Sequence, residues 1–246
     1  MRDSNLVIAV AILITFLASI TPAAAQTETE PSSDCMNISV DTESAPQLNA
    51  AISVCTRVLG HNDLSPKTRT ELLVHRGVAY RNVGDLDKSL ADLGAAQDLT
   101  PEAPLVSRML AWTYRQMGRL VDAENEYGRA LKLEPHPQAF LSRCFVRYGM
   151  KKLEDALADC VKAHGVDPSE DSTYMMALLY RKLGQTSSAQ PLLEGAIGTP
   201  IESGRIYGLL AEIYESSGRP DDARHLRQKG QRKFPKDQNL TLPPTR

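Results

Sequence analysis

The chain has 246 residues, of which 28 are Lys or Arg and 30 are Asp or Glu, so its formal net charge is −2. This balance lacks the positive surface that nucleic-acid binding requires, and we exclude nucleic acid as a partner. Hydrophobic residues make up 42% of the chain, which fits a folded protein with a buried core.

The first element is an uncharged run from Leu6 to Ile20, preceded by Arg2 and followed by three alanines that end at Ala25. A basic start, an apolar centre and small residues at the end are typical of a secretory signal peptide. We predict a signal peptide over residues 1–25 and export to the bacterial periplasm, with no stable membrane span after cleavage. The alternative is an uncleaved N-terminal helix that anchors the chain. Residues 26–45 follow as a polar, flexible leader.

One pattern recurs along the rest of the chain at intervals of 33 or 34 residues. Small residues lie at its first position, at Gly77, Ala111, Cys144, Ala177 and Ala211. In four of these five copies a Tyr follows three positions later, and a Gly follows that Tyr by four positions. Two helices cross closely only where no large side chain stands at the contact, so the pattern predicts packed helix pairs.

This pattern resembles the tetratricopeptide repeat, a helix-turn-helix unit of about 34 residues. The resemblance implies an all-α, right-handed superhelical solenoid, in which stacking supplies the stability that short helices lack. The five units would span residues 70–103, 104–136, 137–169, 170–203 and 204–235. Residues 46–69 match only the second half of a unit and would form an N-terminal capping half-repeat and loop. Residues 236–246 would form a flexible tail.

Four cysteines in an exported chain favour disulfide pairing. Cys35 and Cys55 flank the half-repeat with a spacing similar to that of exported alphaproteobacterial tetratricopeptide proteins. This resemblance implies a Cys35–Cys55 bridge, with two free thiols as the alternative. Cys144 and Cys160 occupy the two small-residue faces of one unit and should be neighbours. We favour two packed thiols there over a bridge, because buried free Cys behaves as a small hydrophobe.

The sequence carries no recognisable catalytic or metal site. Its five histidines have no Ser, Cys or Asp partner at a catalytic spacing. It also has no phosphate-binding glycine loop, no G-x-S-x-G motif and no C-x-x-C or H-x-x-x-H pair. We therefore predict no catalytic residue, no metal and no cofactor, and an enzyme is the weakest hypothesis.

In the repeat family the first helix of each unit lines the inner, concave face, so its exposed positions would form columns along a groove. These columns bring basic and aromatic residues together in a strip made of Arg81, Arg108, Trp112, Arg115, Phe145, Tyr148, Tyr174 and Arg181. Such residues dominate binding hot spots, so we predict a peptide-binding groove here. The alternative is that each Arg marks a solvated helix end and that Trp112 packs between units.

Together these features predict a non-enzymatic protein-interaction scaffold of the cell envelope. Its partner would be a protein or an extended peptide with an acidic segment that faces the arginines. The alternative is a structural subunit that self-associates as a homo-oligomer or stacks with other envelope proteins, so that the groove holds no ligand.

Overall fold

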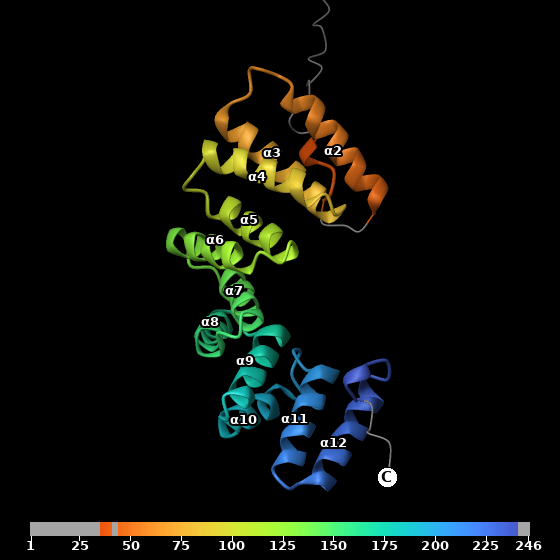
Figure 1. Cartoon of the computed structure of the whole chain (residues 1–246). Coiled ribbons are helices and arrows are strands. Elements are labelled where there is room, and N and C mark those ends of the chain that lie inside the picture. The colour runs from red at the N-terminus through yellow and green to blue at the C-terminus, as the bar shows by residue number, and fades with distance from the viewer. Residues whose placement is uncertain (1–34, 41–43, 241–246) are drawn as a thin grey trace, which may run out of the picture.

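The computed structural model describes residues 35–40 and 44–240, and within them it contains eleven α-helices, one 3₁₀ turn and no strand (Figure 1). The chain is an all-α solenoid, as predicted. The predicted signal peptide, residues 26–34 of the leader and residues 241–246 of the tail lie outside the described residues. None of the described helices is long and apolar enough to cross a membrane.

Two helices fall in each of the five predicted units, and one more precedes them. Five of the helices carry Pro in their first turn, where a missing N–H loses no helical hydrogen bond. The helices are α2 Ala45–Leu59, α3 Pro66–Asn82, α4 Leu86–Leu99, α5 Pro104–Gln116, α6 Leu120–Leu133, α7 Pro137–Gly149, α8 Leu153–Val166, α9 Glu170–Lys182, α10 Thr186–Ala196, α11 Gly204–Ser216 and α12 Pro220–Lys233. Since α3 begins at Pro66, the loop before the first unit is shorter than predicted.

The turn inside four of the units depends on glycine. Gly84, Gly118, Gly184 and Gly218 have φ angles of 73° to 89°, a left-handed conformation that suits a residue without a Cβ. In the third unit, residues 137–169, the equivalent residue is Lys151, with φ 61°. This unit therefore departs from the others at its turn.

A small residue on the first helix faces a larger one on the second, sixteen positions later. A Cβ placed on Gly77 would lie 3.0 Å from Cγ of Leu93, so these two helices touch where the glycine stands. The same offset brings Ala111 and Tyr127 into one buried cluster and Ala177 and Leu193 into another. The recurring small positions therefore mark helix contacts.

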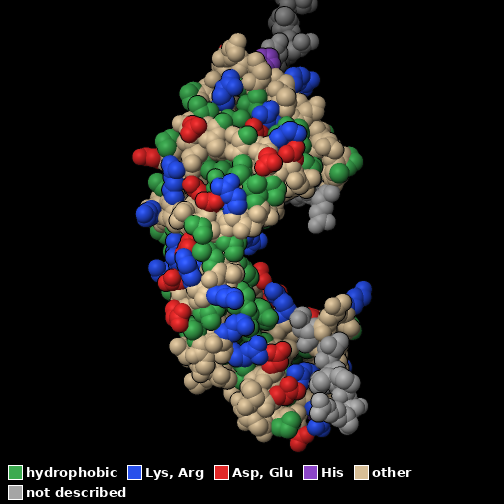
Figure 2. Space-filling view, in the orientation of Figure 1, with side chains coloured by type: hydrophobic (Ala, Val, Ile, Leu, Met, Phe, Trp, Pro, Cys, Tyr) green, Lys and Arg blue, Asp and Glu red, His purple; other side chains and the backbone are tan. Residues whose placement is uncertain are grey.

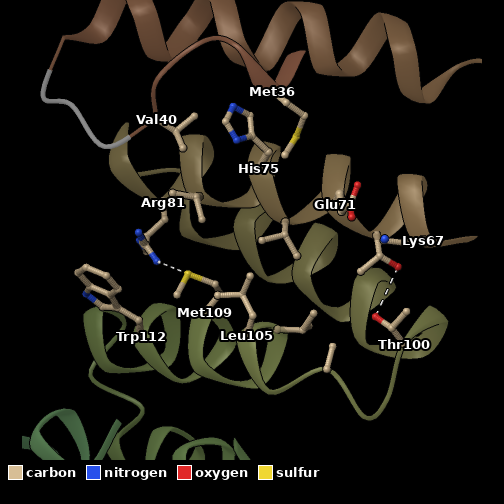
Figure 3. Close-up of a pocket in the computed structure, with 15 residues that line it drawn as sticks. Met36, Val40, Lys67, Glu71, His75, Arg81, Thr100, Leu105, Met109 and Trp112 are labelled. Carbon is tan, nitrogen blue, oxygen red and sulfur yellow. Dashed lines mark hydrogen bonds between the residues drawn. The ribbon is translucent and has the colours of Figure 1, made fainter. Parts of the chain in front are cut away.

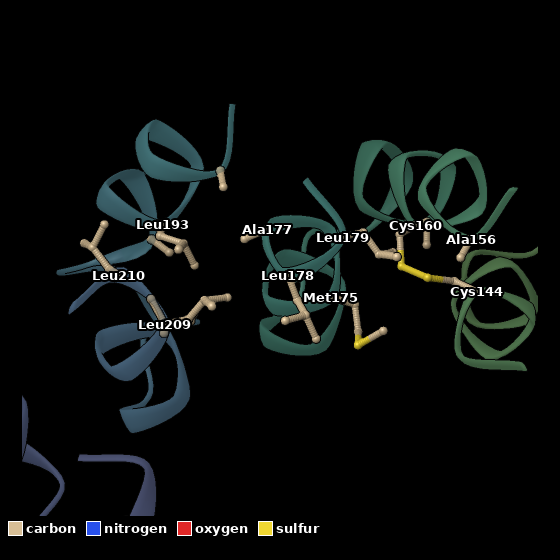
Figure 4. Close-up of a cluster of buried hydrophobic side chains, with 14 of the residues drawn as sticks. Cys144, Ala156, Cys160, Met175, Ala177, Leu178, Leu179, Leu193, Leu209 and Leu210 are labelled. Carbon is tan, nitrogen blue, oxygen red and sulfur yellow. A yellow bond between two sulfur atoms is a disulfide. The ribbon is translucent and has the colours of Figure 1, made fainter. Parts of the chain in front are cut away.

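Both cysteine pairs form disulfides. Cys35 is bonded to Cys55, with the two Cα atoms 4.9 Å apart. Cys144 is bonded to Cys160 across α7 and α8, with a Cα separation of 5.5 Å (Figure 4). The prediction of two packed thiols at Cys144 and Cys160 is wrong, because the sixteen-residue offset puts the two sulfurs face to face at bridging distance.

The two ends of the described chain are more ordered than the sequence predicts. Cys35 and Val40, in the predicted leader, are buried, so residues 35–40 of the leader pack on the fold. At the other end, Leu240 of the predicted tail is fully buried within a 3₁₀ turn at Gln238–Leu240. Its carbonyl accepts a hydrogen bond from Gln231 Nε2 at 2.7 Å, and Gly230 makes room for its side chain.

The helix pairs follow one another in a curve. Helices α3, α5, α7, α9 and α11 contact one another in succession, whereas the second helices contact only their sequence neighbours among the α-helices. Figure 1 places α5, α7 and α9 toward the inside of the curve and α6, α8 and α10 outside it. Figure 2 shows the surface hollowed on the same side, at the right of the view. The first helices thus line the inner face.

Candidate functional site

The inner face holds a first cavity, here called the N-terminal cavity, between α3 and α5. Its volume is about 530 Å³, in the range of small-ligand sites. The lining residues are mostly apolar, and they come from the leader, from α3, from the loop between α4 and α5, and from α5: Met36, Val40, Lys67, Thr70, Glu71, Val74, His75, Val78, Arg81, Thr100, Ala103, Leu105, Val106, Met109 and Trp112. Figure 3 shows Arg81 and Trp112 at one end and Lys67 and Glu71 at the other.

Residues 36–40 form one wall of this cavity and are held in place at three points. The Cys35–Cys55 disulfide fixes the start of the segment to α2. His75 Nε2 lies 2.9 Å from the carbonyl oxygen of Ile38, and since a carbonyl only accepts, the ring nitrogen donates. Asn82 Nδ2 donates to the carbonyl of Val40 at 2.7 Å. The wall is therefore part of the fold.

Trp112 lines both this cavity and the next one along the inner face, and it is stacked against Arg81. The guanidinium of Arg81 lies 4.0 Å from the centre of the indole ring, a distance at which a cation is attracted to an aromatic face. Arg81 is only 4% exposed and also donates to Sδ of Met109 and to Oδ1 of Asn82. Arg81 therefore helps to hold Trp112 in place, and Trp112 keeps 40% of its own surface exposed.

A second cavity of about 450 Å³, here called the central cavity, lies between α5 and α7. Its lining is more polar than that of the first: Arg108, Met109, Trp112, Arg115, Tyr127, His136, Gln138, Ala139, Leu141, Ser142, Phe145 and Asp171. Arg108 and Arg115 are partly buried, and among the described residues neither guanidinium has a hydrogen bond or an ion pair. The one lining carboxylate, Asp171, is paired with Arg205 at 2.7 Å.

Tyr127 forms the back of the central cavity and is almost fully buried. Burial raises the pKa of its hydroxyl, although the hydrogen bond with Ser142 and the positive charges of Arg115 and Arg81 work in the opposite direction. The hydroxyl therefore stays neutral near pH 7. The positive charge of the central cavity comes from its two arginines.

The structure divides the predicted strip into two parts. It brings Arg108, Trp112, Arg115 and Phe145 into the central cavity, and Arg81 reaches Trp112 from the preceding unit. The other three predicted residues line neither cavity. Tyr148 has Lys182 Nζ 5.9 Å from its ring centre, Tyr174 is covered by Arg205 at 5.0 Å, and Arg181 is paired with Glu212.

Several lining residues were not predicted from the sequence. Leu105 and Met109 lie seven and three positions before Trp112, so helical spacing could have placed them on the same face. Met36 and Val40 carried a weaker signal, because apolar residues alternate with polar ones at Met36, Ile38 and Val40, but the segment lies outside the repeats.

One group of residues in the described part of the chain has the spacing of a metal site. The ligand atoms of Cys35, Cys55 and His75 all lie within 4.8 Å of one another. Both sulfurs are joined in the disulfide, and a metal ligand must be a free thiolate. This group therefore serves to fix the 36–40 segment.

A solenoid of helix pairs with a cavity-lined inner face defines a helical-repeat protein. The family model described as tetratricopeptide repeat matches residues 75–140 and 174–237, more than half of the chain. The chain belongs to the tetratricopeptide repeat family. No curated protein matches it.

Solved structures with the same fold have low sequence identity to this chain. A tetratricopeptide repeat protein from Parabacteroides merdae has a TM-score of 0.68 and 19% identity, covering 85% of this chain and 82% of that chain. MamA has a TM-score of 0.60 and 21% identity, covering 64% and 93%. YrrB, described as a tetratricopeptide repeat protein with an unusual peptide-binding site, has a TM-score of 0.63 and 13% identity, covering 76% and 95%. At such identities the likeness concerns the fold.

Proposed function

We propose that this protein is a non-enzymatic interaction scaffold of the cell envelope that binds an extended acidic segment of a partner protein on its inner face. The observation that carries the proposal is the central cavity, where Arg108 and Arg115 flank Trp112 and have no carboxylate partner in the part of the chain that the structure describes. A partly buried arginine without a counter-charge is a ready site for an anionic group, since hydrogen bonds to charged groups contribute about 1.5–3 kcal/mol.

The spacing of the two arginines suits a chain with several carboxylates. Arg108 and Arg115 lie seven residues apart on α5, which is two turns or about 10 Å along the helix. An extended peptide advances about 3.3 Å per residue, so acidic residues three positions apart would meet both guanidinium groups. Trp112 lies between them and offers an aromatic face to the intervening residues.

Two further observations agree with this proposal. YrrB, which shares the fold, is described as having a peptide-binding site, and tetratricopeptide proteins in general act as scaffolds rather than enzymes. The two disulfides indicate an oxidising environment, and with the predicted signal peptide they support a periplasmic location.

The single tryptophan of the chain gives a direct test. The probe is a synthetic octapeptide with glutamates at its fifth and eighth positions and serines elsewhere, titrated into the full chain. We expect saturable quenching of Trp112 fluorescence that weakens as salt is added. Arg115→Glu should weaken binding by about tenfold or more, because loss of one charged contact is worth at least about 1.4 kcal/mol.

The matched control is Arg224→Glu, a charge reversal at an exposed position of α12 outside both cavities. This variant should bind the octapeptide like the original chain. If Arg115→Glu and Arg224→Glu bind equally well, the inner face is not the binding surface. Sedimentation of the unliganded chain over a concentration series then tests self-association as the alternative function.

A further inference from the structure

We infer that the N-terminal cavity is a second binding site, which takes an apolar stretch of the same extended peptide. The ligand would then be apolar over α3 and acidic over α5 and α7. The inference deepens the proposed function and rests on it. It names the class of ligand, a polypeptide segment in which an apolar run is followed by carboxylates.

The first argument is the chemistry of the cavity wall. Its valines lie at the interior, and three large apolar side chains at its rim are unusually exposed: Met36 by 44%, Leu105 by 45% and Trp112 by 40%. Exposed apolar side chains are common singly, but a group of them around one cavity is typical of a binding surface. Figure 3 shows Met36 on one side of the cavity and Leu105 on the other.

The second argument is the connection between the two cavities. Met109 and Trp112 line both of them, so an occupant that passes this pair is in contact with the apolar wall and then with Arg108 and Arg115. A fatty acid would place one carboxylate there and could satisfy only one of two guanidinium groups about 10 Å apart along the helix. A polypeptide with acidic residues three positions apart satisfies both, and the structure therefore favours it.

The third argument is that the apolar site is particular to this end of the solenoid. Between α9 and α11 the corresponding surface is closed by charged side chains, because Arg181 pairs with Glu212 and Arg205 covers Tyr174. Between α3 and α5 Trp112 stands at the repeat position of Glu212, so an aromatic ring meets Arg81 where a carboxylate meets Arg181. Residues 36–40 add an apolar wall beside it. The disulfide at Cys35 holds that wall in position.

The test compares two octapeptides on the full chain by Trp112 fluorescence. One is the serine-rich probe described above, and the other carries leucines at its first three positions with the same two glutamates. The leucine peptide should bind at least about tenfold more tightly, since burial of a single leucine side chain is already worth about 1.5–3 kcal/mol.

Leu105→Glu places a carboxylate at the apolar rim and should abolish this advantage, so that the leucine and serine peptides bind this variant with affinities within about twofold of each other. The matched control is Val121→Glu, the same kind of change at a 60% exposed position of α6 outside both cavities, which should keep the advantage. Met36→Glu tests the opposite wall and replaces Leu105→Glu if that variant does not fold, as judged by circular dichroism.

The wall itself is tested by removing its covalent attachment. The double variant Cys35→Ala with Cys55→Ala should reduce the preference for the leucine peptide. The double variant Cys144→Ala with Cys160→Ala removes the other disulfide and should keep it.

The outcomes separate the two proposals. If Leu105→Glu and Met36→Glu both keep the advantage while Arg115→Glu weakens both peptides, the apolar site is wrong and the proposed site for an acidic peptide in the central cavity stands. If Arg115→Glu weakens neither peptide, the proposed function fails and this inference fails with it. If oleate displaces the leucine peptide and binds Arg108→Glu as tightly as the original chain, the cavity is an acyl-chain site and the peptide assignment is overturned.

Discussion

The third unit, α7 and α8, and the fourth unit, α9 and α10, hold their helices together by different means. At the contact where the first helix carries its small residue, the third unit has the Cys144–Cys160 disulfide. The fourth unit has Ala177 in the same place and Leu193 sixteen positions later, and both are fully buried. The repeat therefore requires a close contact at this point, and either a covalent bond or a small residue against a large one can supply it.

The third unit also has an ionic network for which the fourth shows no counterpart among the described residues. Asp159 of α8 accepts hydrogen bonds from Arg143 and Arg147 of α7, and its side chain is only 2% exposed. Arg147 also bonds Glu124 of α6 at 2.8 Å. Burial raises the pKa of Glu124, but the hydrogen bonds from Lys152 and Arg147 outweigh it and leave that pKa lowered. The network thus ties α7 to the helices on both sides of it.

The position of the third unit gives this difference a functional meaning. Helix α7 lies in the middle of the inner face and contributes Phe145 to the central cavity. The disulfide and the ion pairs restrict its movement relative to α6 and α8. A helix held in this way keeps the cavity in one shape, which lowers the ordering cost when a ligand binds.

Among the variants that test this comparison, Asp159→Asn should cause the largest loss of stability. The substitution removes the shared partner of two partly buried arginines, and breaking a buried ion pair typically costs about 3–5 kcal/mol. We expect the lower end of this range, because Arg143 and Arg147 keep 15% and 19% of their side chains exposed. Urea unfolding followed by far-UV circular dichroism measures the change in free energy of unfolding.

Asp92→Asn is the matched control, since Asp92 occupies the equivalent position in the first unit and bonds one arginine, Arg76, through both oxygens at 2.7 Å. Its loss should be smaller, about 1–3 kcal/mol. Equal losses for Asp92→Asn and Asp159→Asn would show that the second arginine of the third unit adds nothing to its stability.

A loss no larger than that of Asp159→Asn is expected when the contact of the third unit is rebuilt to resemble that of the fourth. Cys144→Ala with Cys160→Ala should lose roughly 3 kcal/mol, the chain-entropy value for a loop of this length. Cys144→Ala with Cys160→Leu recreates the pair formed by Ala177 and Leu193. It should recover about 1.5 kcal/mol or more of that loss, because the leucine fills the space between the helices.

Thermal unfolding of the two double variants under identical conditions decides this prediction. Equal stability of the Ala–Ala and Ala–Leu variants would mean that the contact in the third unit does not accept a large apolar side chain. The pairing of a small residue on the first helix with a large residue on the second would then not apply to the third unit.

The fold was predictable because the same turn and the same helix contact recur in several copies of the repeat. Gly84, Gly118 and Gly184 mark turns that need a left-handed backbone, and small residues 33 or 34 positions apart mark helix contacts. The ends were predicted less well because they belong to no repeat. Nothing local in the sequence shows that Leu240 packs beside Gly230. The alternation of Met36, Ile38 and Val40 marks an apolar face, but it does not show what that face packs against.

The candidate site was predictable where one helix supplies it. Arg108, Trp112 and Arg115 lie on one face of α5 through helical spacing alone, and the structure brings them into one cavity. Helical spacing does not show which residue of a neighbouring unit a side chain will contact. Arg81 was predicted as an open cation, but its side chain turns over the indole of the next unit, and Arg181 pairs with a glutamate of α11.

The smallest expected effect concerns the turn of the third unit. Lys151 has a left-handed backbone, which costs a residue with a Cβ roughly 1–2 kcal/mol, whereas the fourth unit has Gly184 at this point. Lys151→Gly removes that cost but gives the unfolded chain more freedom, worth about 0.4–1 kcal/mol in the opposite direction. The net result should be a gain in stability of about 0.5–1 kcal/mol.

Gly184→Lys makes the reverse change in the fourth unit and should lose a similar amount, since nothing lies within 4 Å of a Cβ at that position. The loss there should also be easier to detect, because the fourth unit has no disulfide among its described residues to limit local opening. Urea unfolding of both variants tests the pair. If Lys151→Gly is neutral while Gly184→Lys is destabilising, the left-handed backbone at Lys151 does not lower the stability of the third unit. The Cys144–Cys160 disulfide, rather than the turn, then sets the stability of that unit.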